Sequence, residues 1–358
     1  MTSAPSLDPR IETATSHWSA RFVANGVPLS DFQRVTESIT QWDDWCAAWS
    51  RHGAAHEALG REALAAGFAL SAGAHFTRAA VCYHFGKFLF VHRLDEMRTA
   101  HERAVACRNA ALPHLRPAGE RVAIPFGGAT LYGNLRRPAG VARPPVVVMC
   151  MGLDSAKEEM NAYEHDFLVR GMATLAFDGP GQGEAEYDLA IRGDYEAPVK
   201  AVCDWLERRE DVDAGRIGLW GVSLGGYYAP RAAAFEPRAR ACVSLSGPYR
   251  WVDVFDAANP LTRAAFRVRS RSADDAEARV KAATLTLEGA AARIACPLLI
   301  VAGENDNLIP PAHAERMAQE APHATLMVVA GGNHVANNVW YRYRPQSADW
   351  LARQLGAG

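Results

Sequence analysis

Apolar residues recur at helical spacing through the first third of the chain. Between about residues 10 and 112, no segment alternates apolar and polar residues as a strand does, and proline is nearly absent. Trp42, Trp45 and Trp49 stand at positions i, i+3 and i+7, which places them on one face of a helix. We therefore predict an all-helical N-terminal domain over residues 1–115, whose aromatic-rich faces need an apolar partner.

From Arg121 onward, the period changes to that of short buried strands. Gly127-Gly128 separates two strand-like runs and predicts a β-hairpin. Six further apolar runs alternate with helical segments, which is typical of a mostly parallel sheet covered by helices on both faces. The predicted strands are Pro145–Cys150, Ala173–Phe177, Arg216–Trp220, Ala241–Leu245, Pro297–Ala302 and Thr325–Val329, and the predicted helices lie near 159–170, 195–209, 224–236, 311–320 and 346–355. We assign residues 116–358 to this α/β domain, with a charged helical insertion at about 248–292 as a candidate lid.

Composition and charge narrow the classes of partner. The 358 residues carry a formal net charge of −2, which gives no electrostatic reason to expect nucleic acid or an acidic membrane surface. No run reaches the roughly 20 apolar residues of a membrane span, and the first residues lack the basic and apolar regions of a signal peptide. Seven scattered cysteines without a Cys-x-x-Cys motif favour reduced thiols. We therefore expect a cytoplasmic protein with neither nucleic acid nor a membrane as its partner.

A serine stands between a predicted strand and a predicted helix, with a glycine two residues to either side. The residues are Gly221-Val222-Ser223-Leu224-Gly225, the pattern of a nucleophile elbow. Such a turn is so tight that its flanking positions leave no room for a Cβ, and it holds the Ser223 hydroxyl at the positive end of the following helix. We predict that Ser223 is a nucleophile; the alternative is an inert serine in a glycine-rich turn.

Loops that follow two later strands supply partners for this serine, because catalytic residues gather at the carboxyl ends of parallel strands. One loop contains Glu304 and Asp306, and the other ends in His334. The chain order Ser, Asp, His is that of the α/β-hydrolases. We predict His334 as the base and Asp306 as the acid that orients it. Glu304 and His323 are the alternatives, although His323 precedes its strand and therefore belongs at the opposite edge of the sheet.

Stabilisation of an oxyanion needs two backbone N–H groups near the nucleophile. We predict that Leu224, directly after the serine, and Leu153, in the loop after the first parallel strand, supply them. Asp154 comes next and is a candidate substrate-binding carboxylate, the alternative being a helix cap or a surface group. Ser155 and Glu158 have the spacing of a capping box for the following helix.

Two motifs imitate ligand sites. Asp178-Gly179-Pro180-Gly181-Gln182-Gly183 resembles a phosphate loop, but the proline blocks that geometry and no lysine follows, so we predict a tight turn in which Asp178 accepts backbone amides. His52 and His56 stand at i and i+4, but the residue after His52 is not the glutamate of a zinc peptidase. We therefore predict no metal site.

Further motifs carry a family resemblance over the chain from about residue 60 to its end. They are Gly152-Leu153-Asp154-Ser155 with Lys157-Glu158-Glu159, Phe177 to Glu184, Gly193-Asp194-Tyr195-Glu196, Ser223-Leu224-Gly225-Gly226, Pro260-Leu261-Thr262 and Ile294-Ala295-Cys296-Pro297. Together they resemble the 2,6-dihydroxypseudooxynicotine hydrolase-like α/β-hydrolases. This group has a helical N-terminal domain and includes fermentation-respiration switch esterases and fungal polyketide-shortening hydrolases.

The resemblance implies a serine hydrolase that cleaves a carbon–carbon bond next to a ketone, in an aryl ketone or a 1,3-diketone, through an acyl-enzyme. It implies a homodimer, a substrate held between the helical domain and the core, and the triad Ser223, Asp306 and His334. Asp154 aligns with a family glutamate that handles the substrate. The same triad serves a carboxylesterase or lactonase acting on a small aromatic ester, and a non-catalytic binding protein is a third possibility. The chemistry requires no cofactor.

Overall fold

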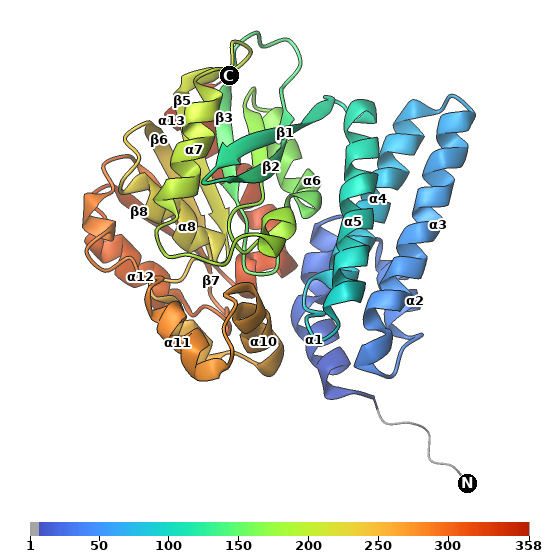
Figure 1. Cartoon of the computed structure of the whole chain (residues 1–358). Helices are drawn as coiled ribbons and strands as arrows, with labels where there is room; N and C mark the ends of the chain where they lie inside the picture. The colour runs from blue at the N-terminus through green and yellow to red at the C-terminus, as the bar shows by residue number, and fades with distance from the viewer. Residues whose placement is uncertain (1–6, 358) are drawn as a thin grey trace. The chain divides into compact units, whose positions relative to one another are not determined.

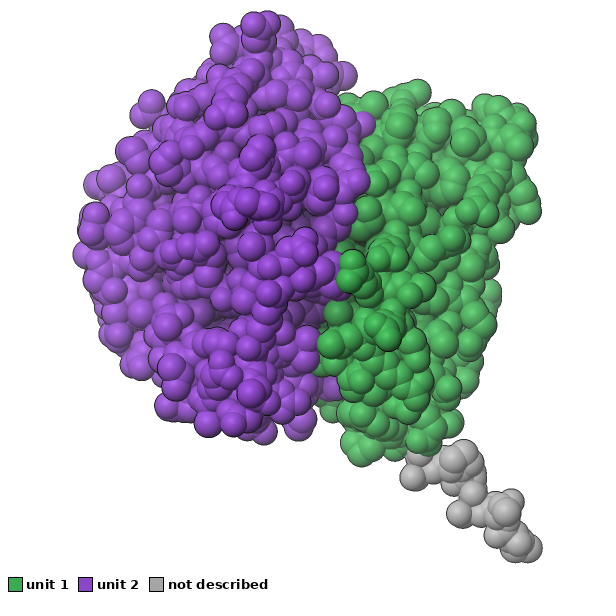
Figure 2. Space-filling view, in the orientation of Figure 1, with its two compact units in different colours: residues 1–118, 158–162 green, residues 119–157, 163–358 purple. Residues whose placement is uncertain are grey.

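The computed structural model describes residues 7–357, which form two compact units (Figure 1; Figure 2). The helical unit comprises the chain up to Ala118 together with Glu158–Ala162, and the sheet unit comprises Gly119–Lys157 and Tyr163–Gly358. The first six residues, on which much of the signal-peptide expectation rests, lie outside the described residues. Over residues 7–357, no helix combines the length and the apolar character needed to cross a bilayer.

The helical unit is built around a core of aromatic side chains. Its helices are α1 (Pro9–Ala24), α2 (Leu29–Thr36), α3 (Trp45–Ala65), α4 (Ala69–Lys87) and α5 (Leu94–Ala111), with 3-10 turns at Trp42–Asp44 and Leu112–His114. Trp42, Trp45 and Trp49 are all buried, and the ring of Phe22 stacks on that of Phe85 with 3.8 Å between centroids. The predicted tryptophan face is thus confirmed as core, although Trp42 precedes the helix that carries the other two.

Helices α3 and α4 approach closely because glycine occupies positions where they meet. A methyl group at Gly60 would lie 2.8 Å from the ring of Phe76, and one at Gly53 would lie 3.0 Å from the ring of Tyr83. Both distances are shorter than a normal carbon contact, so a side chain at either position would force the helices apart. The close approach fixes which side chains of α3 and α4 face each other.

The segment Glu158–Ala162 belongs to the helical unit through a buried carboxylate. Glu159 accepts two hydrogen bonds of 2.7 Å from the guanidinium of Arg21 and one from the amide of Asn25, and it lies 3.0 Å from the His84 ring. Burial alone would raise the pKa of Glu159, but Arg21 and His84 outweigh it and hold that pKa well below its usual value. Glu159 is therefore ionised in this cluster.

This cluster explains a correction to the predicted helix near 159–170. The α-helix, α6 (Asn161–Leu168), begins two residues later than expected, and Lys157–Glu159 forms a 3-10 turn in front of it. Ser155 and Glu158 therefore lie before the first turn of α6, and their capping box stays a prediction. The side chain of Glu159 contacts Arg21, Asn25 and His84, which lie far away in the sequence.

The sheet unit contains one sheet in the order β1-β2-β4-β3-β5-β6-β7-β8. The strands are β1 (Gly119–Phe126), β2 (Ala129–Arg136), β3 (Pro145–Cys150), β4 (Ala173–Phe177), β5 (Asp213–Val222), β6 (Ala239–Leu245), β7 (Leu298–Gly303) and β8 (Ala324–Val329). β1 and β2 form the predicted hairpin, β2 also pairs antiparallel with β4, and the remaining pairs are parallel. Every residue of β3, β4 and β7 is buried, as expected for strands covered on both faces.

Helices cover both faces of this sheet, as predicted. Besides α6 and the helices between β6 and β7, they are α7 (Glu196–Leu206), α8 (Gly225–Ala233), α12 (Pro311–Glu320) and α13 (Arg344–Leu355). Within β5, Gly218 faces Leu351 and Leu355 of α13, whereas Gly221 faces α8. Because residues an odd number apart on a strand point to opposite faces, α8 and α13 lie on opposite sides of the sheet, in front of and behind the strands in Figure 1.

The predicted insertion lies between β6 and β7. It contains α9 (Trp251–Ala257), α10 (Pro260–Arg269) and α11 (Asp275–Ala283). An isolated antiparallel bridge between Arg250 and Thr286 brings the two ends of this insertion side by side.

Candidate active site

Ser223 occupies a strained corner between β5 and α8. Its φ angle is 56°, in the left-handed region that residues other than glycine rarely adopt. A methyl group at Gly221 would lie 1.9 Å from the carbonyl oxygen of Gly225, and one at Gly225 would lie 2.1 Å from that of Cys150. Only glycine fits at either position, which is the steric requirement of a nucleophile elbow.

The structure brings Ser223, His334 and Asp306 into one hydrogen-bonded chain. Nε2 of His334 lies 3.0 Å from Oγ of Ser223, and its Nδ1 lies 2.8 Å from Oδ2 of Asp306. An imidazole that donates from Nδ1 to the carboxylate presents the Nε2 lone pair to the serine hydroxyl. The geometry is that of a serine, a general base and an orienting acid.

Asp306 is held as a carboxylate in a nearly closed environment. It is 3% exposed, and its Oδ1 accepts the backbone N–H groups of Leu308 and Ile309 at 3.0 and 2.9 Å. Burial by itself would raise the pKa of Asp306, but His334 and the two backbone donors outweigh burial and lower that pKa below its usual value. The carboxylate is therefore ionised at neutral pH and lies 2.8 Å from Nδ1 of His334.

The alternative acid and base lie elsewhere. Glu304 is exposed, and its Oε2 accepts the backbone N–H of Gly331 at 2.8 Å. His323 is exposed and precedes β8, so it stands at the end of that strand opposite to His334. Of the candidates that the sequence left open, the structure brings Asp306 and His334 to the serine.

The loop after β3 lies against Ser223. A methyl group at Gly152 would lie 3.2 Å from Cβ of Ser223. Leu153 and Leu224 are both buried, and in residues 7–357 neither donates its backbone N–H to another described group. Two buried N–H groups on the segments that flank the serine hydroxyl fit the predicted oxyanion donors. Asp154 follows on the same loop and is partly exposed.

Gln182 holds this loop in place, a role that the sequence reasoning missed. Its side-chain amide donates to the carbonyl oxygens of Met151 and Gly152 at 2.5 and 2.9 Å, and its Oε1 accepts from the Tyr195 hydroxyl at 2.7 Å. Tyr195 is fully buried and stacks on Tyr228 with 3.8 Å between ring centroids. With the carbonyls of Met151 and Gly152 fixed on one side, the following N–H groups are turned to the other. Gln182 and Tyr195 both lie in motifs that carry the family resemblance, and those motifs were the sequence signal that could have indicated this role.

A second pair of contacts joins the same loop to the strand end of β4. The carboxylate of Asp178 accepts the backbone N–H groups of Lys157 and Glu184, each at 2.9 Å, as predicted for the tight turn. The ammonium of Lys157 is fully buried, 2.6 Å from Asp178 and 2.7 Å from Glu184. A buried charge with two close partners resists displacement, because separating them would leave it unpaired.

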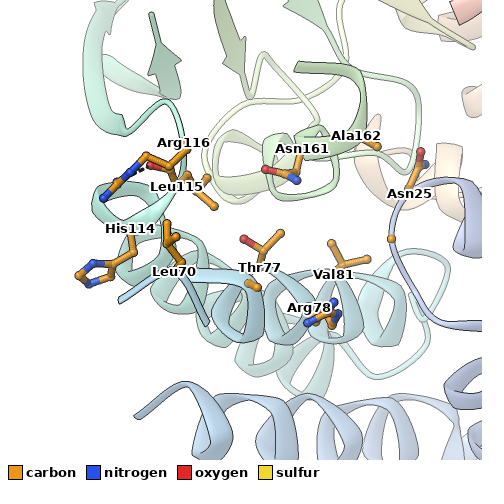
Figure 3. Close-up of a pocket in the computed structure, with 12 residues that line it drawn as sticks. Asn25, Leu70, Thr77, Arg78, Val81, His114, Leu115, Arg116, Asn161 and Ala162 are labelled. Atoms are coloured by element: carbon orange, nitrogen blue, oxygen red, sulfur yellow. Dashed lines mark hydrogen bonds between the residues drawn. The ribbon is translucent and has the colours of Figure 1, made fainter. Parts of the chain in front are cut away.

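A cavity of about 320 Å³ lies in the helical unit, apart from these residues (Figure 3). Its polar lining includes Thr77, Arg78, His114, Arg116 and Asn161, and every lining residue belongs to the helical unit. The lining contains none of the six residues predicted for the active site.

Comparison with known proteins identifies relatives over most of the chain. The profile of the prolyl oligopeptidase family matches residues 161–358. The 2,6-dihydropseudooxynicotine hydrolase of Paenarthrobacter nicotinovorans is 36% identical over 345 residues, which cover 94% of this chain and 92% of the relative. The 20-hydroxy-prefusarin hydrolase of Gibberella moniliformis is 33% identical over 60% of this chain and 54% of its own length.

A solved structure supports the same relationship. The crystal structure of the 2,6-dihydroxy-pseudo-oxynicotine hydrolase matches with a TM-score of 0.87 at 34% identity and covers 94% of this chain and 95% of that chain. Sequence and fold therefore agree with the resemblance carried by the motifs. The chain belongs to the prolyl oligopeptidase family of α/β-hydrolases and is an enzyme related to 2,6-dihydropseudooxynicotine hydrolase.

Proposed function

We propose that this enzyme is a serine hydrolase that cleaves a carbon–carbon bond next to a ketone through an acyl-enzyme. The main support is the hydrogen-bonded chain from Asp306 through His334 to the strained Ser223. The relationship to a hydrolase of a pseudooxynicotine, over nearly the whole of both chains, supports the choice of substrate class. The triad and the backbone donors supply the nucleophile and the charge stabilisation without a metal or an organic cofactor.

In the first half of the reaction, Oγ of Ser223 attacks the ketone carbon while Nε2 of His334 takes the hydroxyl proton. The carbonyl oxygen becomes an oxyanion that accepts from the N–H groups of Leu153 and Leu224. Collapse of this adduct breaks the carbon–carbon bond, and the leaving carbon receives the proton from His334. Water, deprotonated by the same imidazole, then hydrolyses the acyl-enzyme.

Expulsion of carbon is feasible only where the leaving carbon can carry negative charge, as in an enol terminus or a hydroxylated aromatic ring. A carboxylate near that group would hold a substrate hydroxyl and favour the reactive keto tautomer. We assign this role to Asp154, which follows the oxyanion donor Leu153 on the same loop. An ester has no such requirement, because its leaving oxygen needs only the proton from His334.

Substrate screening tests the proposal directly. Purified enzyme is assayed against hydroxyaryl ketones, 1,3-diketones and aryl esters, and the acyl-enzyme is sought by intact mass after rapid acid quench. We expect turnover of a ketone and a mass increase that equals its acyl group. Turnover of esters alone would identify a carboxylesterase or lactonase, and no turnover together with no labelling by a fluorophosphonate would identify a binding protein.

Replacing Asp154 by asparagine should separate the two chemistries. We expect a loss of roughly 10²-fold or more in turnover of a hydroxyaryl ketone, the size typical of a positioned acid–base group. Turnover of a simple aryl ester should change little. The measurement is kcat for both substrates in wild type and variant, with Asp188→Asn as a control at an exposed carboxylate. Small and equal effects on both substrates would favour the esterase alternative.

Gln182 should affect the rate without contacting the substrate, because it positions the oxyanion loop. Gln182→Ala frees the carbonyls of Met151 and Gly152, so we expect kcat to fall by about 10²-fold, the lower end of the loss for one oxyanion donor. KM should change little. Tyr195→Phe removes only the bond to Oε1 of Gln182 and should cost less than Gln182→Ala. Equal losses in the two variants, or a change confined to KM, would contradict this positioning role.

The expected homodimer and cytoplasmic location are part of this proposal. All seven cysteines are free, and six of them are buried, which supports a reducing compartment. Light scattering coupled to gel filtration of the full chain tests the dimer, for which the expected mass is twice the 38.8 kDa of the chain.

A further inference from the structure

Four side chains from three helices converge inside the helical unit. His52 and His56 lie one turn apart on the same face of α3, Asp31 comes from α2, and Cys82 comes from α4. The Nε2 atoms of His52 and His56 lie 3.2 and 3.1 Å from the same oxygen, Oδ2 of Asp31. One nitrogen of each ring and Sγ of Cys82 all lie within 4.8 Å of one another.

Hydrogen bonding within the cluster is incomplete. Nε2 of His52 is buried and makes no hydrogen bond to any described residue, although Oδ2 of Asp31 is 3.2 Å away. The contact therefore has the distance of a hydrogen bond without its alignment. A buried ring nitrogen whose contact with a carboxylate is poorly aligned needs an explanation, and an unplaced ion is one of the recognised kinds.

The spacing of the donors suits a small dication. Two ligands at about 2.1 Å from a tetrahedral ion lie about 3.4 Å apart, close to the 3.2 and 3.1 Å between Asp31 and the two imidazoles. The Cys82 sulfur lies within 4.8 Å of a ring nitrogen of each histidine, so it needs to move toward the ion to form a Zn–S bond of about 2.3 Å. Rotation of side chains on fixed helices achieves such a shift.

The donor types favour zinc. Thiolate and imidazole are the ligands of structural zinc sites, and a carboxylate is an accepted fourth ligand. The thiolate of Cys82 and the carboxylate of Asp31 neutralise a dication, which matters because Arg78 acts electrostatically on both His56 and Cys82. Binding breaks the S–H bond of Cys82, forms a Zn–S bond and releases the proton to water.

The surroundings of the cluster resemble the outer shell of a metal site. Nδ1 of His56 lies 3.5 Å from Nδ1 of His75, so the ring nitrogen that would not bind zinc has a partner on α4. The side chains of His52 and His56 are 14% and 13% exposed, whereas Cys82 is buried. An ion can therefore enter from the histidine side and reach the sulfur.

We propose that Asp31, His52, His56 and Cys82 bind one structural Zn²⁺ that ties α2, α3 and α4 together. Four protein ligands fill a tetrahedral site and leave no position for water, so the site has no catalytic role. The missing glutamate after His52 excluded a zinc peptidase in the sequence analysis, but a closed structural site does not need that glutamate. The site is separate from the hydrolytic residues, all of which belong to the sheet unit.

The test uses the full chain, stripped with a chelator and then loaded with Zn²⁺ or Co²⁺. We expect one zinc per chain by elemental analysis after desalting. Co²⁺ should give a near-ultraviolet thiolate charge-transfer band and the strong visible bands of a tetrahedral site. Zinc should also raise the unfolding temperature of the stripped protein by several degrees, because it binds the folded state.

Matched variants locate the ligands. Cys82→Ala should lose the thiolate band, and His52→Gln should lose zinc and the zinc-dependent rise in unfolding temperature. Cys107→Ala, at another buried cysteine of the helical unit, and His92→Gln, at a partly exposed histidine paired with Asp43, should keep both.

If Cys82→Ala does not fold, His52→Gln still tests zinc binding. The side chain of His52 is partly exposed, so we expect this variant to fold. A stripped wild-type protein that takes up no zinc, or zinc and cobalt signals that survive in His52→Gln, would overturn the proposal.

Discussion

Replacing Ser223 by alanine should lower turnover by at least about 10³-fold and leave the fold intact. In the proposed mechanism, the hydroxyl is the group that becomes covalently bound, and the backbone donors of Leu153 and Leu224 account for the remaining rate. The φ angle of 56° at this position is as unfavourable for alanine as for serine, so the substitution removes the oxygen without changing the backbone strain.

Ser223→Gly separates chemistry from folding. Glycine also lacks the oxygen, but it adopts a positive φ angle without strain. We therefore expect Ser223→Gly to be as inactive as Ser223→Ala and to unfold at a temperature no lower than that of wild type. Loss of activity together with a lowered unfolding temperature in both variants would point to a structural role for the hydroxyl.

Covalent labelling identifies the nucleophile independently of the natural substrate. A fluorophosphonate should add one probe mass to the wild type, and peptide mapping should place it on Ser223. Ser38→Ala, at a serine of the helical unit whose hydroxyl donates to the carbonyl of Val35, is the control and should label and turn over normally. Labelling at any other residue would contradict the assignment.

The sheet was predictable because its signals are local. Runs such as those of β3 and β4 are continuously apolar, since both faces are covered, and their bounds match the predicted ones. The position of Ser223 followed from glycines that tolerate no Cβ. The pairing of Asp306 with His334 followed from the rule that loops after parallel strands meet at one edge, and the hydrogen bonds agree with it. Their catalytic roles stay predictions.

Contacts that depend on distant residues were not predictable in this way. Glu159 looked like part of a helix start, but it is buried with Arg21 and His84, which are 138 and 75 residues away. The hydrogen bonds of Gln182 to Met151 and Gly152 depend on how two loops meet at the sheet edge. Local residue preferences do not indicate how two distant loops pack together. From the sequence, a polar residue in a glycine-rich turn is expected to be exposed to solvent.

The backbone conformation after His334 was also not predictable from the sequence. Val335 and Ala336 have φ angles of 62° and 47°, although neither residue favours a positive φ. The N–H of Val335 donates to Oγ of Ser246, and that serine itself has a φ angle of 47° after β6. Residues held in such conformations gather where the surrounding structure fixes a functional side chain. Here the constrained turn carries the imidazole.

His334 and Ser223 should behave as one unit. His334→Ala should cost about as much as Ser223→Ala, at least about 10³-fold, because a serine hydroxyl without its base is a poor nucleophile. The double variant should lose little more than either single variant, since each change already abolishes the same step. The measurement is kcat/KM of the three variants on one substrate, and losses that multiply in the double variant would contradict His334 as the base of Ser223.

Asp306→Asn should preserve the shape of the site and still lower turnover by about 10⁴-fold, the size expected for the orienting acid of such a triad. An amide that donates to Nδ1 would favour the tautomer with its proton on Nε2, which can no longer accept from Ser223. The matched controls are the two alternatives that the sequence offered. Glu304→Gln and His323→Ala, both at exposed side chains, should leave turnover within about twofold of wild type, because substitutions away from such networks have small effects. A loss in Glu304→Gln as large as that in Asp306→Asn would show that the acid has been assigned to the wrong carboxylate.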